Sequence, residues 1–151
     1  MPIIDSLSCA DVADPERFIR VDVADAQNAA QTREYFGRWL QRYFDLDPIR
    51  LSDLVLAANE ALANSAEFAY LRSHEVGAVG LRAVFEPADA TLTVTISDNG
   101  LWRIPDPSPA TRARGRGITL MRALADRAAI ETSSDGTEVC LVWNGVVPLT
   151  D

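Results

Sequence analysis

The hydrophobic residues of this chain change their spacing about halfway along its length. From 48 to 71, apolar side chains recur every three or four residues, a pattern typical of a helix with one buried face. Over 78–85 and 91–97 they alternate with polar residues, a pattern typical of strands with one buried face. Helices and strands that each have one apolar face must pack against each other. The sequence therefore predicts an α/β (α+β) two-layer sandwich.

The rest of the chain predicts further elements of both kinds. Residues 17–23 mix aromatic and β-branched side chains and indicate a first strand. Asp25 is placed to cap a helix that runs to about Phe44, and Asp47 followed by proline is a start signal for the helix from 48. After the two central strands come a proline-rich loop, a short helix and two last strands: 101–116, 117–126, 128–132 and 137–143. The predicted order is β-α-α-β-β-loop-α-β-β, in one domain over 17–151 behind a lead-in over 1–16.

Composition excludes several classes of protein. The chain has 151 residues and a net charge of −8, which argues against a general nucleic-acid coat with a basic face. It has neither an apolar run of membrane-spanning length nor a basic N-terminal region of the signal-peptide kind. All 14 basic residues are arginine, so mechanisms that need a lysine are excluded. Two cysteines far apart do not indicate a disulfide framework or a zinc site, and a cytoplasmic protein is expected.

Two polar residues share a face of the predicted helix 48–71. Glu60 and Asn64 stand one helical turn apart. A carboxylate can accept a proton from a hydroxyl group or water, and an amide oxygen can bind Mg²⁺. The same spacing is common on solvated helix surfaces, so the pair alone does not decide between these interpretations.

Asp98, Asn99 and Gly100 follow directly on the predicted strand 91–97. This tripeptide is common as a plain turn. In the functional alternative, Asp98 is a carboxylate at a strand end that accepts a hydrogen bond from the amine of a base. Gly100 would then let a ligand approach the backbone closely.

A basic, glycine-rich segment opens the short predicted helix. It consists of Arg114, Gly115, Arg116 and Gly117, and free N–H groups at a helix start favour phosphate. Six arginines and two acidic residues give 103–127 a charge of +4 within an acidic chain. The structural alternative is a loop of solvated arginines. Gly136 and Thr137 form a turn before the last strand and have a structural role by default.

Taken in order, these pieces resemble the GHKL ATPase superfamily. That superfamily has an Asn-containing box on a helix, an Asp-x-Gly box, a lid, a glycine box that opens a helix, and a final Gly-Thr. Within it, the chain resembles the bacterial anti-sigma factor serine/threonine kinase group, RsbW-like and of actinobacterial type. The resemblance spans roughly residues 17–144 and is carried by NEALANSAEFAY, SDNGLWRIPDP and RGRGITLMRALAD.

The resemblance implies the Bergerat fold, with a mixed, mostly antiparallel sheet covered on one face by helices, and ATP and Mg²⁺ as cofactors. It implies that Glu60 is the catalytic base for the substrate serine and that Asn64 holds Mg²⁺. Asp98 would bind the adenine amine with Gly100 beside the base, and Thr137 would support the far side of the pocket. The residues that would wrap the phosphates are Arg114, Gly115, Arg116 and Gly117.

The implied activity is that of a protein-serine/threonine kinase that is also an anti-sigma factor. It would phosphorylate a STAS-domain anti-sigma factor antagonist and regulate a sigma factor by partner switching, as a homodimer without direct contact to nucleic acid or membrane. A first alternative is a binding module whose nucleotide switches partners without phosphoryl transfer. A second, the catalytic domain of a histidine kinase, is disfavoured because no helix with a phosphoacceptor histidine precedes the domain.

Overall fold

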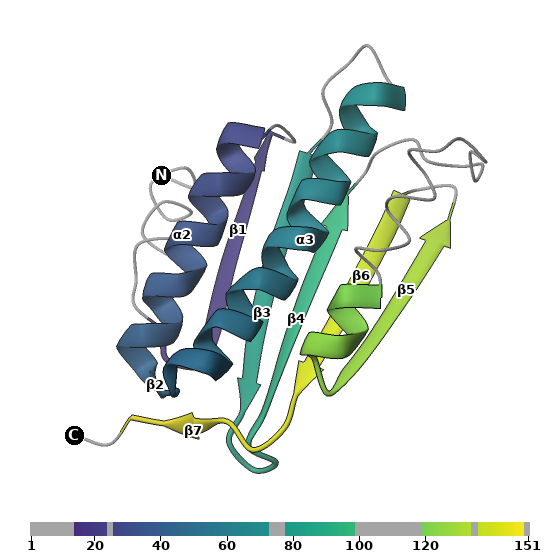
Figure 1. Cartoon of the computed structure of the whole chain (residues 1–151). Helices are drawn as coiled ribbons and strands as arrows, with labels where there is room; N and C mark the ends of the chain where they lie inside the picture. Colours follow the sequence, from purple (N-terminus) through teal and green to yellow (C-terminus); the bar gives the residue numbers. More distant parts are fainter. Residues whose placement is uncertain (1–13, 24–25, 73–77, 99–118, 134–135, 150–151) are drawn as a thin grey trace, which may run out of the picture.

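The computed structural model describes residues 14–23, 26–72, 78–98, 119–133 and 136–149. Two long helices lie side by side on one face of a five-stranded sheet (Figure 1). The helices are α2 (Ala26–Tyr43) and α3 (Pro48–Arg72), and residues 119–124 form a further short helix. The strands are β1 (Arg17–Val23), β2 (Phe44–Asp45), β3 (Ala78–Glu86), β4 (Thr91–Asp98), β5 (Arg127–Ser133), β6 (Gly136–Trp143) and β7 (Val147–Pro148).

The strands of the main sheet are arranged in the order β1-β3-β4-β6-β5. Each neighbouring pair in this sheet is antiparallel. The two-layer α/β sandwich predicted from the change of hydrophobic spacing is confirmed, and so is the order of the predicted strands and helices. The loop predicted over 101–116 lies outside the described residues. The sequence did not predict the two-residue strands β2 and β7, which pair with each other in a separate small sheet.

Asp47 starts α3 in the way its sequence context predicts. The backbone N–H of Arg50 donates to Asp47 Oδ1 over 2.7 Å, and the N–H of Leu51 donates to the Asp47 carbonyl over 2.9 Å. These bonds satisfy N–H groups that have no acceptor inside the helix. Asp25, the predicted cap of α2, lies outside the described residues.

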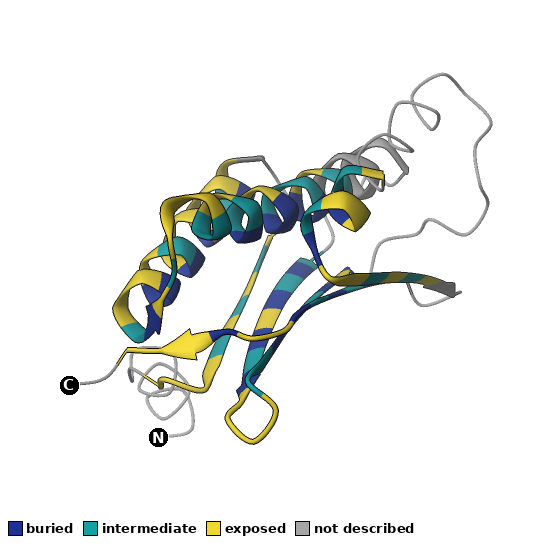
Figure 2. Ribbon diagram, turned by 60° about the horizontal axis from the view of Figure 1, so that its bottom comes forward, coloured by how far each residue is buried: buried dark blue, intermediate teal, exposed yellow. Residues whose placement is uncertain are grey.

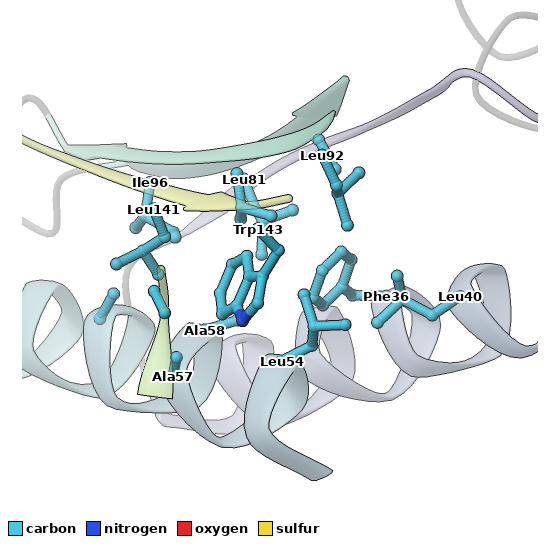
Figure 3. Packing of buried hydrophobic residues seen from close by; sticks show 14 of the residues in the cluster. Phe36, Leu40, Leu54, Ala57, Ala58, Leu81, Leu92, Ile96, Leu141 and Trp143 are labelled. Atoms are coloured by element: carbon cyan, nitrogen blue, oxygen red, sulfur yellow. The ribbon is translucent and has the colours of Figure 1, made fainter. Parts of the chain in front are cut away.

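The core fills the space between the helices and the sheet (Figure 2). Along β3 and β4 the residues alternate between buried and more exposed, so each strand turns one apolar row toward the helices. In Figure 3, side chains from both helices meet this row. The largest fully buried side chains include Phe36, Leu40, Leu54, Leu62, Leu81, Leu92, Ile96, Leu141 and Trp143.

Small residues bring α3 close to the sheet. Ala57, Ala58 and Ala61 have no exposed surface, and in Figure 3 the first two lie beneath the sheet beside Leu54. A larger side chain at these positions would meet a tightly packed interior, which tolerates added volume poorly. The alanines therefore allow α3, and the polar groups on it, to lie close to the sheet.

The hairpin between β3 and β4 marks one end of the molecule. Its turn contains Ala90, whose φ of 53° lies in the left-handed region. The N–H of Val146 donates to the Ala90 carbonyl over 2.9 Å, and the Arg50 guanidinium donates to the carbonyl of Asn144. The first turn of α3 is thus attached to the hairpin end. Among the helices of the described residues, none combines the length and apolar character needed to cross a bilayer.

Candidate nucleotide site

Glu60 and Asn64 lie along one flank of α3, and both are partly buried. At about 100° per residue, Asp53, Glu60 and Asn64 fall within a sector of roughly 40°. Asp53 lines a groove together with Leu124 and Asp126. This flank of α3 therefore faces the side of the molecule on which the helix 119–124 lies.

The opposite flank of α3 faces α2. There the guanidinium of Arg33 donates to Asn59 Oδ1 over 3.4 Å, and Val55 lines a groove with residues of α2. Glu60 and Asn64 are thus turned away from the helix–helix contact. Their side chains are placed where a ligand over the end of the sheet could reach them.

Asp98 ends β4 on the face of the sheet that the helices cover. It continues the row of Val94 and Ile96, and it is only 6% exposed. Its register partners are Val79 on β3 and Thr137 on β6. Buried ionisable groups are frequent at functional sites, so a buried carboxylate at a strand end is a candidate functional position.

Thr137 faces the same way as Asp98 from the next strand. It is 3% exposed, and within the part of the chain that the structure describes its Oγ1 is buried without a hydrogen-bond partner. A buried hydroxyl group normally has a partner, which can be a bound ligand. This position is compatible with the prediction that Thr137 supports the pocket. A purely structural role before the last strand would not explain why its hydroxyl group is buried.

The Glu60–Asn64 pair on α3 and the Asp98–Thr137 pair on the sheet lie toward the same end of the molecule. Asn64 is about 24 Å along the helix axis from Pro48, and Asp98 is about 23 Å along its strand from Thr91. Both elements begin near the hairpin end and run in the same direction (Figure 1). The fold thus brings the Glu60–Asn64 flank and the Asp98–Thr137 pair to one end of the α3–β4 layer.

The other predicted site residues lie outside the described residues. They are Gly100, Arg114, Gly115, Arg116 and Gly117. On the helix 119–124, which follows these residues in the chain, Arg122 is exposed and Met121 is buried. Trp143 Nε1 donates to the Leu124 carbonyl over 3.0 Å and fixes the end of this helix to β6.

The polar groups at this end fit a nucleotide and its magnesium ion. The Asp98 carboxylate can accept a hydrogen bond from an amine, and the Thr137 hydroxyl beside it has no partner among the described residues. Among the described residues, no group of three or more His, Cys, Asp or Glu could hold a metal ion by itself. Mg²⁺ in phosphate-transferring sites usually takes one or two protein ligands plus phosphates and water, so one amide oxygen on α3 fits that pattern.

That Asp98 and Thr137 are neighbours was not predicted from the sequence. The sequence signal was present, since Asp98 ends one alternating run and Thr137 begins another. Which strands pair, however, is decided by packing and not by a local pattern. Ala61, which holds the Glu60–Asn64 turn against the sheet, was missed as well.

Comparison with known proteins identifies the family of the chain and a solved structure of similar fold. Residues 23–143 match the model of the histidine kinase-like ATPase domain. A crystal structure of the RsbU and RsbW domains of a Mycobacterium tuberculosis protein is similar in fold, with a TM-score of 0.67 and 19% sequence identity. The similarity covers 89% of this chain and 33% of that one, so the chain spans about a third of the protein it matches. Since the domain model covers most of its length, the chain belongs to the histidine kinase-like ATPase domain family.

Proposed function

We propose that the chain is an ATP-binding anti-sigma factor with protein-serine/threonine kinase activity. Membership of an ATPase family implies an ATP site. The observation that carries the proposal is the buried Asp98–Thr137 pair at the same end of the molecule as Glu60 and Asn64. A kinase needs a base-binding acceptor, a magnesium ligand and a proton acceptor in one place, and these residues supply one of each.

In this proposal each residue has a separate role in holding the nucleotide. The Asp98 carboxylate accepts a hydrogen bond from the adenine amine, with Gly100 beside the base. The Thr137 hydroxyl was expected on the far side of the pocket, but it lies directly beside Asp98 and supports the same end of the pocket. Asn64 holds Mg²⁺, which neutralises phosphate charge. The phosphates are wrapped by Arg114, Gly115, Arg116 and Gly117.

Glu60 is the proposed general base for the transfer step. It accepts the proton of the substrate serine or threonine hydroxyl while that oxygen bonds to the γ-phosphorus of ATP. The bond from this phosphorus to the β–γ bridging oxygen breaks, and ADP leaves. Positioning and charge neutralisation supply most of the rate in such reactions, so the transfer step needs only one proton acceptor beside the groups that hold the nucleotide.

The similarity in fold to a structure that contains an RsbW domain supports the proposed partners. The phosphate acceptor is a STAS-domain anti-sigma factor antagonist, and the second partner is a sigma factor that the chain releases or retains by partner switching. We place the protein in the cytoplasm as a homodimer. The alternative is a binding module in which the nucleotide changes partner affinity and no phosphate is transferred.

Phosphate transfer from γ-labelled ATP to the STAS-domain proteins of the source organism tests the proposal. The wild type should label one of them on Ser or Thr. Glu60→Gln should lose transfer by a factor of at least 100 and keep ATP affinity within about threefold, since a general base contributes about 10²–10⁴-fold. Glu86→Gln makes the same chemical change at an exposed strand end and should transfer normally.

The outcomes separate the two functions. Unlabelled STAS proteins whose binding still depends on ATP would establish the binding module and overturn the kinase. Transfer that persists in Glu60→Gln would exclude Glu60 as the base. Failure of the wild type to bind millimolar Mg-ATP would overturn both.

A further inference from the structure

A groove runs between α2 and α3 on the side of the helices that faces away from the sheet. Its volume is about 370 Å³, and α2 lines it with Arg33, Glu34, Gly37 and Arg38, while α3 contributes Leu51 and Val55. This groove lies on the flank of α3 opposite to Glu60 and Asn64. It is therefore a different surface from the candidate nucleotide site.

The α3 side of the groove is uncharged and partly apolar. Leu51 and Val55 are half-buried in it, and Leu56 next to them is 38% exposed. Ser52, Asn59 and Ala63 complete the outward-facing positions of this stretch. This side of the groove can take apolar side chains of a partner but has no charged group of its own.

The α2 side of the groove has an excess of one positive charge, from Arg33 and Arg38 against Glu34. Glu34 forms an ion pair with Arg38 over 2.7 Å. No described carboxylate lies within ion-pair distance of Arg33, whose guanidinium donates only to the neutral Asn59. One charge at the rim is thus unneutralised, on a chain whose net charge is −8. An acidic group is the partner chemistry that this rim complements.

Gly37 stands in the middle of α2, where glycine lowers helix stability relative to alanine. A Cβ added there would lie 3.7 Å from Val55 Cγ2, an ordinary contact distance. Packing of the two helices therefore does not require a glycine. What the glycine does provide is an open floor, because any side chain at this position would project into the groove.

We propose that this groove binds an acidic, amphipathic helical segment of a protein partner. Leucine-like side chains of the segment lie on Leu51 and Val55 over the floor left open by Gly37, and its carboxylates pair with Arg33. Binding of a helix in a groove between helices is a common mode of peptide recognition. The proposal does not depend on the nucleotide site, because none of the groove residues lies on that flank of α3.

Fluorescence anisotropy with two synthetic helical peptides tests the proposal on the full chain. One peptide carries leucine at every third or fourth position and glutamate elsewhere, and the other replaces each glutamate with lysine. The acidic peptide should bind at least tenfold more tightly, and its affinity should fall as salt is raised. Equal binding of the two peptides, or no binding of the acidic one at submillimolar concentration, would overturn the proposal.

Paired variants locate the binding. Arg33→Glu should lower the affinity for the acidic peptide about tenfold. Arg82→Glu makes the same change on the exposed opposite face of the sheet and should change this affinity less than twofold. Gly37→Ala should weaken binding at least threefold while raising the melting temperature, by up to about 2–4 °C. If the Gly37→Ala protein is more stable but binds the acidic peptide as well as the wild type, binding does not require the space that Gly37 leaves open. If Gly37→Ala changes the association state of the chain and not peptide binding, the occupant is a second copy and the proposal is wrong.

Discussion

Asp98 and Thr137 lie opposite each other on the antiparallel strands β4 and β6, with both side chains buried on the helix-covered face of the sheet. Directly opposed residues in an antiparallel pair project on the same side and have Cβ atoms about 4.5–5.5 Å apart. A carboxylate acceptor and a hydroxyl group are thus held together by backbone pairing alone. Because two central strands hold them, the pair needs no loop to position it.

Asp98→Asn should weaken ATP binding by about 10–100-fold. The substitution keeps the shape of the side chain but removes its charge and turns one acceptor oxygen into a donor, and a hydrogen bond to a charged group contributes about 1.5–3 kcal/mol. Calorimetry with Mg-ATP measures the effect. Asp89→Asn, the same change in the exposed hairpin turn, is the control and should bind like the wild type. Equal affinities of the two variants would mean that Asp98 does not contact the base.

Thr137→Val should lower the affinity for ATP without lowering the free energy of unfolding. In the free protein the free energy of unfolding should be unchanged or rise by about 1 kcal/mol, because a buried hydroxyl with no partner among the described residues is replaced by a methyl group. ATP affinity should fall about 3–10-fold, the equivalent of one neutral hydrogen bond. Urea unfolding and calorimetry give the two values, with Thr95→Val on the open face of β4 as control. A loss of stability above about 1 kcal/mol would show that the hydroxyl already has a partner within the protein.

Ala61→Leu should lower the free energy of unfolding by about 1–3 kcal/mol, since it adds volume to a fully packed contact between α3 and the sheet. It should also weaken ATP binding, because displacement of this turn moves both Glu60 and Asn64. Ala63→Leu places the same side chain on the exposed face of the helix and should change stability by less than about 0.5 kcal/mol. Urea unfolding of the two variants checks the prediction, and similar losses in both would contradict it.

Asp47→Ala should lower stability by about 1 kcal/mol, because the N–H of Arg50 loses the acceptor that caps α3. Asp47→Asn keeps an acceptor oxygen and should recover most of the loss. Asp45→Ala, an exposed neighbour on β2, controls for the removal of charge. Thermal unfolding followed by circular dichroism distinguishes these three variants, and an unchanged Asp47→Ala protein would show that the cap contributes nothing.

Local patterns in the sequence predicted most of the elements. The first strand was predicted over Arg17–Val23 and has those bounds in the structure. The start of α3 at Pro48 and the hairpin after Glu86 were also predicted, because a cap and a turn depend on residues close together in the chain. β2 was missed and Phe44 was assigned to the preceding helix, since a strand of two residues has no period to detect.

The candidate site was predicted only in part. Glu60 and Asn64 were placed on one face correctly, because a helix sets the angle between residues one turn apart. The sequence did not reveal that this face turns away from α2, as that orientation depends on which side of α3 its neighbours occupy. Gly37 had no visible role in the sequence either, because the groove exists only where α2 lies against α3.

The sequence by itself determined most of the elements, their order and much of each apolar face. These properties follow from hydrophobic spacing, capping and turn residues, all of which act over a few positions. Only the tertiary structure decided that β6 enters the sheet between β4 and β5, which places Thr137 opposite Asp98. An alternating strand specifies that one face is buried but not which strand lies beside it. The neighbour is chosen by the packing of all the apolar rows under the two helices at once.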